Sequence, residues 1–154
     1  MLYALPQKGE RTRLKMNVPV LIPTLNPTKR ILEVVSALVS EGFPRIIVVN
    51  DGSRAECAPI FAELEAMPQC TVLRHEVNRG KGRGLKTGFS YIVKNLPDCD
   101  GVVTTDDDGQ HSPADILRCA EQMSRTGRAV LGARDFSGRD VPARSRLGNS
   151  ITSL

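Results

Sequence analysis

Three consecutive carboxylates, Asp106, Asp107 and Asp108, follow a short apolar run and precede a Gly-Gln-His sequence. Adjacent carboxylates repel one another, so a fold that gathers them at the end of a strand normally supplies a cation. Ligand sets made only of oxygen atoms suit Mg²⁺ or Mn²⁺. Because such a cation keeps coordination positions open for phosphate oxygens, this stretch predicts a site for a nucleotide or a sugar nucleotide.

Two other interpretations of the acidic stretch stay open. A run of like charges is most often a solvated loop, but Val102 and Val103 fix this run at the end of a strand. A phosphatase or phosphotransferase could use a strand-end Asp as nucleophile, although Gln110 stands where that pattern usually has Thr or Val. His111 could be a ligand or a base, but a polar loop histidine is the commoner case.

A second polar motif, residues 50–53, follows another apolar run. It puts Asp51 at the carboxyl end of the expected sheet, where open α/β folds bind ligands. Asn, Asp, Gly and Ser are also ordinary turn formers. The motif therefore predicts either a ligand contact or a simple turn.

The segment 78–84 has three glycines at alternate positions, with Arg79, Lys81 and Arg83 beside them. Glycines let a backbone approach a ligand closely, and a helix that begins here would favour an anion. The spacing is neither that of a Walker loop nor that of a dinucleotide fingerprint. An anion-binding loop and a flexible exposed loop are equally compatible with it.

Short β-branched runs alternate with amphipathic stretches, which predicts an α/β fold with a mostly parallel sheet flanked by helices. We expect strands at 18–22, 45–49, 71–74, 101–105 and 128–133. Helices are expected at 27–40, 55–66, 84–95 and from 113 to about 126. Asn26 and Ser112 are placed to cap two of these helices.

Composition limits the class of protein. A chain of 154 residues with 40% hydrophobic and 25% charged residues is typical of one soluble globular domain. Aromatic residues make up 4%, and no Trp is present, so we expect no nucleic-acid partner of the stacking type. The four cysteines have no C-x-x-C spacing, which favours reduced thiols and a cytoplasmic location. No apolar run is long enough for a membrane span.

The charge distribution suggests three segments. The net charge of +4 is made up of +3 in residues 1–16, +3 in residues 128–154 and −2 between them. We expect a basic leader at 1–16, a nucleotide-sugar-binding α/β domain at 17–134, and an acceptor-side or membrane-proximal segment at 135–154. From residue 142 onward Leu147, Ile151 and Leu154 share one helical face. That helix could lie on an anionic membrane at its inner face, or pack into an ordinary core.

Four segments taken in order, 22–26, 48–53, 78–82 and 105–111, resemble the family 2 glycosyltransferases of GT-A fold. The likeness is greatest to the branch with dolichol-phosphate mannose synthase and bacterial polyprenyl-phosphate sugar transferases, and it covers roughly residues 17–150. Each segment is weakly specific alone, whereas the ordered set is specific.

The resemblance implies a set of positions that bind the nucleotide sugar. They are Pro23, Thr24, Leu25, Asn26, Asp51, Gly52, Ser53, Asn78, Gly80, Lys81, Gly82, Asp106, Asp107, Asp108 and Arg134. In the family, Asp51 would contact the base. Asp106 and Asp108 match the outer residues of a D-x-D motif that holds Mg²⁺ or Mn²⁺, and Asp107 fills a position where a small residue is more usual.

Arg134 and the segment 135–138 resemble the stretch that closes over the sugar. Two departures from the family pattern exist. Leu25 and Pro27 stand where Tyr and Glu are frequent, so part of the contact to base or ribose differs. The family's catalytic base is expected beyond Leu154, and none is assigned.

The implied activity is metal-dependent transfer of a hexose, with inversion, from a UDP- or GDP-sugar to an acceptor such as a polyprenyl phosphate of the cell envelope. One alternative is a non-catalytic module that binds nucleotide sugars. A sugar-phosphate nucleotidyltransferase is disfavoured, because it would need a glycine-rich loop with an Arg directly after the first strand, where this chain has residues 23–26.

Overall fold

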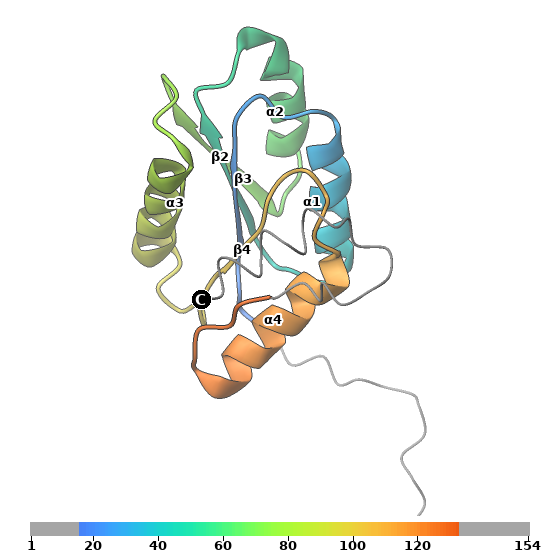
Figure 1. Cartoon of the computed structure of the whole chain (residues 1–154), viewed down its shortest axis with the longest axis vertical. Helices are drawn as coiled ribbons and strands as arrows, with labels where there is room; N and C mark the ends of the chain where they lie inside the picture. The colour runs from blue at the N-terminus through green and yellow to red at the C-terminus, as the bar shows by residue number, and fades with distance from the viewer. Residues whose placement is uncertain (1–15, 133–154) are drawn as a thin grey trace, which may run out of the picture.

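A computed structural model describes residues 16–132 of the chain. Four parallel strands form one sheet in the order β3-β2-β1-β4 (Figure 1). The strands are β1 (Val20–Thr24), β2 (Ile46–Asp51), β3 (Cys70–His75) and β4 (Val103–Thr104). The helices are α1 (Arg30–Ser40), the short 3-10 helix η1 (Ala55–Cys57), α2 (Ala58–Glu65), α3 (Lys81–Asn95) and α4 (Pro113–Thr126). The expected α/β class is confirmed.

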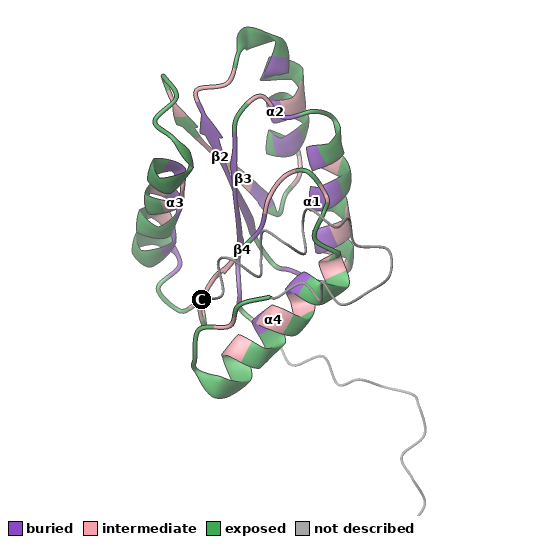
Figure 2. Ribbon diagram, in the orientation of Figure 1, coloured by how far each residue is buried: buried purple, intermediate pink, exposed green. Residues whose placement is uncertain are grey.

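Helices cover both faces of the sheet. Alternate residues of β1 point to opposite faces, so Val20 and Ile22 join one apolar core while Leu21 joins the other. The first core packs against α1, α2 and α4, and the second against α3 (Figure 2). At Gly88 of α3 an added Cβ would lie 2.2 Å from the Leu21 side chain. Glycine therefore lets α3 approach the sheet closely.

Two expectations about the elements are wrong. Asn26 does not cap α1, because the helix begins at Arg30 and Asn26 adopts a positive φ of 53° in the preceding loop. Residues 128–132 form no strand, since Gly127 ends α4 in a left-handed conformation and the segment after it joins no strand among the described residues. Residue 133 of that expected strand lies outside the description.

The expected cap of α4 is confirmed. Ser112 caps α4 by accepting a hydrogen bond from the Asp115 amide at 3.1 Å. The four cysteines are free. Within residues 16–132 no helix combines the length and the apolar character needed to cross a membrane. The expected leader at 1–16 lies almost entirely outside the described part of the chain, as does the expected segment 135–154.

The parallel topology brings polar residues together at one edge. Strands β3, β2 and β1 end at His75, Asp51 and Thr24, and β4 runs into the acidic stretch through Thr105. Because all four strands point the same way, these ends lie along the carboxyl edge of the sheet in the order β3-β2-β1-β4. The candidate site is built on this edge.

Candidate functional site

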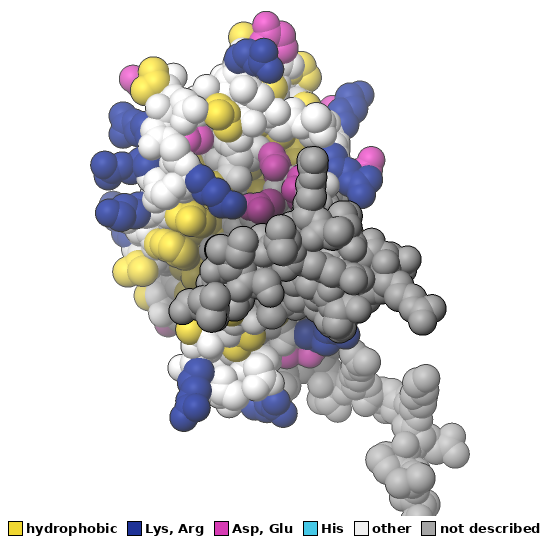
Figure 3. Space-filling model, in the orientation of Figure 1, with side chains coloured by type: hydrophobic (Ala, Val, Ile, Leu, Met, Phe, Trp, Pro, Cys, Tyr) yellow, Lys and Arg dark blue, Asp and Glu magenta, His cyan; other side chains and the backbone are white. Residues whose placement is uncertain are grey.

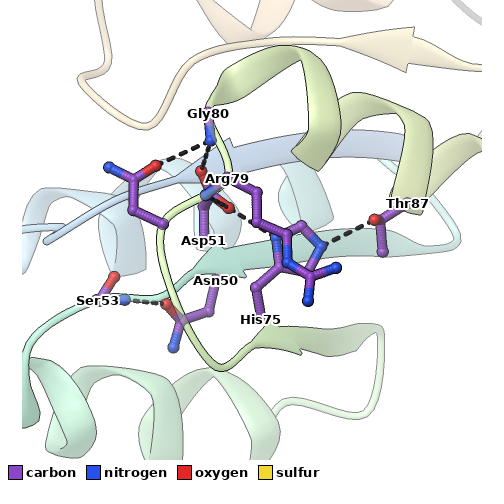
Figure 4. A network of polar contacts seen from close by, with 8 residues as sticks. Asn50, Asp51, Ser53, His75, Arg79, Gly80 and Thr87 are labelled. Atoms are coloured by element: carbon purple, nitrogen blue, oxygen red, sulfur yellow. Dashed lines mark hydrogen bonds and ion pairs between the residues drawn. The ribbon is translucent and has the colours of Figure 1, made fainter.

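Asp51 at the end of β2 is buried, and both of its carboxylate oxygens accept hydrogen bonds from the protein. Its side chain is 5% exposed. Oδ1 accepts a hydrogen bond from the Arg79 amide at 2.9 Å, and Oδ2 accepts one from the Gly80 amide at 2.7 Å. Figure 4 shows the carboxylate below the turn that leads into α3. Asp51 therefore holds the segment 78–84, which we call the glycine-rich loop, in place from beneath.

His75 completes this network from the neighbouring strand. Its Nδ1 lies 2.6 Å from Asp51 Oδ1, and its Nε2 lies 2.8 Å from Thr87 Oγ1 on α3 (Figure 4). His75 and Thr87 were not expected at the site from the sequence. A signal was available, since His75 follows directly on the expected strand 71–74 and thus reaches the same sheet edge as Asp51.

The contacts of Asp51 decide its ionisation. Burial raises the pKa of this carboxyl group, whereas the hydrogen bonds from His75, Arg79 and Gly80 lower it. The hydrogen bonds prevail, and the pKa of Asp51 lies below its ordinary value of 3.8. The group is therefore an anion at neutral pH, and His75 Nδ1 donates its proton to it.

The loops after β1 and β2 are tied to each other. The Asn26 amide donates to Ser53 Oγ at 2.8 Å, and the Arg54 amide donates to Asn26 Oδ1 at 2.9 Å. Gly52 has a φ of 73°, and a Cβ there would lie 2.3 Å from the backbone carbon of Val77. Glycine is needed at this position because the glycine-rich loop packs directly against it.

Two consecutive residues connect the ends of β2 and β4. The Gly80 amide binds Asp51, and the next residue, Lys81, places its Nζ 2.6 Å from Asp106 Oδ1. Lys81 also begins α3. The first turn of this helix thus bridges the buried carboxylate and the acidic stretch, which the sequence predicted only as separate motifs.

The three carboxylates of the acidic stretch take three different partners. Asp106 meets Lys81, Asp107 Oδ2 accepts from Thr24 Oγ1, and Asp108 Oδ1 accepts from the Gln110 amide at 2.9 Å. No group of three or more His, Cys, Asp or Glu side chains within residues 16–132 is arranged to hold a metal ion. Figure 3 shows acidic side chains gathered near the centre of one face, with a basic side chain beside them.

A small hollow of about 180 Å³ lies beside the acidic stretch. Its walls come from β1, α3, the end of β4 and the region after it: Pro23, Lys81, Leu85, Thr104, Thr105, Asp106 and His111. A larger hollow of about 670 Å³ adjoins it between β4 and α4 and extends to residues 130–132. The smaller one contains more of the expected site residues, so we take it as the core of the candidate site.

Thr105 lines both hollows and carries an unusual buried group. Its Oγ1 is buried and has no hydrogen-bond partner in the part of the chain that the structure describes. An unpartnered buried hydroxyl costs about 1–3 kcal/mol. Such a cost directly before the acidic stretch is typical of a functional site rather than of a region selected only for stability.

Most residues expected at the site lie along this edge. Asp51 is buried beneath the glycine-rich loop and does not line the small hollow. Leu25 is 42% exposed. Gly82 faces open space, because an added Cβ there would meet no atom within 4 Å. Arg134, expected over the sugar, lies outside the described residues, as does the segment 135–138.

Comparisons with known proteins identify the family of this chain. The family model described as Glycosyl transferase family 2 matches residues 20–152. An uncharacterized protein of Methanocaldococcus jannaschii, MJ1222, is 32% identical over 139 residues, which cover 88% of this chain and 55% of that protein. UDP-N-acetylglucosamine–dolichyl-phosphate N-acetylglucosaminyltransferase of Methanococcus voltae is 29% identical, with 84% of this chain and 58% of that protein covered.

More distant matches extend the same picture. Undecaprenyl-phosphate 4-deoxy-4-formamido-L-arabinose transferase of Pectobacterium atrosepticum is 27% identical, covering 90% of this chain and 42% of that protein. The crystal structure of S. aureus TarS 1-349 superposes with a TM-score of 0.57 at 23% identity, covering 82% of this chain and 38% of that chain. This likeness confirms the GT-A fold. The chain spans about half the length of the curated relatives it matches.

Proposed function

The chain belongs to glycosyl transferase family 2, and from this membership we propose that it binds a UDP- or GDP-sugar and transfers the sugar to a lipid phosphate, with a divalent metal ion. The names of two relatives supply the substrate classes, a UDP-sugar with a dolichyl phosphate and an undecaprenyl phosphate. One observation carries the proposal. Gly80 and Lys81 join the buried Asp51 to the acidic stretch, so the loop held by Asp51 lies beside the expected diphosphate side at one sheet edge.

The first turn of α3 suits a diphosphate. The amides at the start of a helix favour an anion, and Lys81 adds an ammonium group whose side chain is 64% exposed. An added Cβ at Gly80 would meet no atom within 4 Å, so a ligand has open space beside this backbone. We therefore assign the phosphates of the donor to this turn.

Asp106 and Asp108 fit a divalent ion that is shared with the donor. Proteins commonly hold Mg²⁺ through one or two carboxylates, and substrate phosphates complete its ligands. The absence of a three-residue ligand group in the described residues is therefore compatible with a metal that binds together with the nucleotide sugar. When bound, the ion would neutralise the charge that develops on the departing nucleoside diphosphate.

The reaction is an in-line displacement at the anomeric carbon. A bond forms from the acceptor oxygen to that carbon while the bond to the diphosphate oxygen breaks, and the configuration inverts. A phosphate acceptor is already an anion and needs little help from a general base. This fits a site in which we assign no base.

Calorimetry with a panel of UDP- and GDP-sugars, with and without Mn²⁺, tests the proposal. We expect one nucleotide class to bind, more tightly with Mn²⁺, and the Mn²⁺ effect to disappear in Asp106→Ala. Binding that ignores both the metal and the substitution would contradict the metal assignment. Binding without transfer to an added polyprenyl phosphate would favour the non-catalytic alternative.

A further inference from the structure

The outer surface of α3 has a charge pattern unlike that of the other helices. Between residues 77 and 97 the chain carries five basic residues and no acidic one. Along the helix Arg83, Lys86 and Lys94 are exposed, together with Phe89 and Val93. We call these five residues the α3 outer face.

The fold fixes which way this face points. Gly84, Gly88 and Ile92 are the buried residues of α3, and they pack it against the sheet. Lys86, Phe89 and Val93 follow one another at spacings of three and four, so they form one stripe on the side away from the sheet. Phe89 is 39% exposed and Val93 is 76% exposed.

The charges of the α3 outer face are not neutralised within the described part of the chain. No carboxylate oxygen there lies within 4.0 Å of its basic nitrogens. By contrast, Arg30 and Arg118 on α1 and α4 each pair with an acidic residue three positions away on the same helix. Figure 3 shows basic and hydrophobic side chains gathered along the side where α3 lies.

We propose that the α3 outer face docks on an anionic lipid surface. Basic side chains are attracted to anionic headgroups, and apolar side chains between them insert at the boundary of the acyl chains. Two apolar and three basic residues give reversible binding rather than a permanent anchor. The low aromatic content of 4% makes a stacked nucleic acid a poorer occupant.

Docking of this helix would also serve the candidate site. Lys81 and Leu85, in the first turns of α3, line the small hollow beside Asp106. The helix that lies on the membrane would thus be the helix that borders the reaction site. A lipid phosphate could reach the hollow while its hydrocarbon chain stays in the bilayer. The choice of a lipid partner rests in this respect on the proposed function.

Vesicle flotation tests the proposal without donor or acceptor. We expect the full chain to bind vesicles that contain phosphatidylglycerol and not vesicles of phosphatidylcholine alone. Lys86→Glu reverses one charge on the face and should reduce partitioning by about tenfold or more. Phe89→Ser with Val93→Ser should reduce it with the charge unchanged. Arg125→Glu on α4 makes the same change of charge elsewhere and should reduce partitioning much less.

Several results would overturn the proposal. They are equal losses for Lys86→Glu and Arg125→Glu, binding that does not depend on anionic lipid, and displacement of the protein from vesicles by single-stranded RNA at equal concentration. Calorimetric donor binding by the same variants keeps the two proposals apart. Lipid binding without donor binding would contradict the proposed function alone, and the converse would contradict docking by α3 alone.

Discussion

The ends of β2 and β4 both present aspartate, and the two are built in opposite ways. Asp51 is 5% exposed and accepts hydrogen bonds from His75 and two loop amides. Asp106 is 40% exposed, and within residues 16–132 its carboxylate meets only the exposed ammonium group of Lys81. Asp51 is therefore held in place by the surrounding structure, whereas Asp106 remains accessible from solvent.

The difference in exposure suggests that Asp51 positions the loop and that the acidic stretch binds the ligand. A buried carboxylate whose two oxygens already accept hydrogen bonds has little capacity left for a ligand, but it stabilises the loop above it. An exposed carboxylate beside a lysine contributes little to stability, since exposed ion pairs give about 0–1 kcal/mol. We therefore expect changes at Asp51 to act first on folding, and changes at the acidic stretch to act on ligand binding.

Asp51→Asn should give the largest effect on stability. The Asn side chain has nearly the same size, but its NH₂ group cannot accept one of the two loop amide hydrogen bonds, and the contact with His75 loses its charged acceptor. We expect the free energy of unfolding to fall by about 2–3 kcal/mol. Urea denaturation measures it. Asp98→Asn changes an exposed aspartate and should fall within about 0.5 kcal/mol of the parent. Equal losses of stability in Asp51→Asn and Asp98→Asn would contradict the structural role of Asp51.

Acid should reveal the same difference. The pKa of Asp51 is lower in the folded protein than its ordinary value of 3.8, so the folded state binds fewer protons there than the unfolded state. The stability from this group is present above pH 3.8 and is lost as the pH falls through the folded pKa. Urea midpoints at decreasing pH should therefore converge for the parent and Asp51→Asn. A gap that widens in acid would contradict the assignment.

Asp106→Asn with Asp108→Asn should act on ligand binding. We expect Mn²⁺-dependent affinity for the nucleotide sugar to fall at least about tenfold, which corresponds to about 1.4 kcal/mol. Stability should change by less than in Asp51→Asn, because both side chains are partly or fully exposed. Calorimetry and urea denaturation of the same sample measure the two quantities. A large loss of stability with unchanged affinity would contradict the assignment of Asp106 and Asp108 to ligand binding.

Thr105→Val tests the unpartnered hydroxyl with an almost isosteric change. If the hydroxyl serves the site, donor affinity should fall while stability stays equal or rises by about 1 kcal/mol, because an unsatisfied buried group is removed. Thermal unfolding and calorimetry give the two values. Lower stability would mean that the hydroxyl has a structural partner.

Lys81→Gln should have the smallest effect on folding. Both partners of its ion pair are exposed, so we expect a change in unfolding free energy of less than about 1 kcal/mol. The free energy of donor binding should weaken by more than this change in unfolding free energy, since the Lys81 ammonium group is assigned to the donor phosphates. A loss of stability with unchanged donor affinity would mean that Lys81, like Asp51, has a structural role.

Local patterns predicted much of this molecule. The β-branched runs located the strands, and the parallel arrangement then brought Asp51 and the acidic stretch to one edge. Contacts between distant segments were beyond such reasoning. His75 meets Asp51 only because β3 pairs with β2 in the register that aligns the two residues. Asn26, a good helix cap by type, instead joins the loop after β2, because tertiary contacts outweigh local preference.

The segment 128–132 also shows that local sequence does not determine tertiary pairing. Its apolar residues suggested a strand, but a strand also needs a partner edge, which local sequence does not reveal. The short β4 had the opposite outcome. It was predicted over 101–105 and pairs only through Val103 and Thr104, which is still enough to fix the position of the acidic stretch.

Paramagnetic broadening by Mn²⁺ in the presence of a nucleoside diphosphate tests the central claim most directly. Backbone amide signals of residues 105–110 and of the first turn of α3 should broaden in the parent protein. In Asp106→Asn with Asp108→Asn they should stay sharp, whereas Asp98→Asn should behave as the parent. Broadening centred on another region, or unchanged in the double variant, would contradict a metal held at the end of β4.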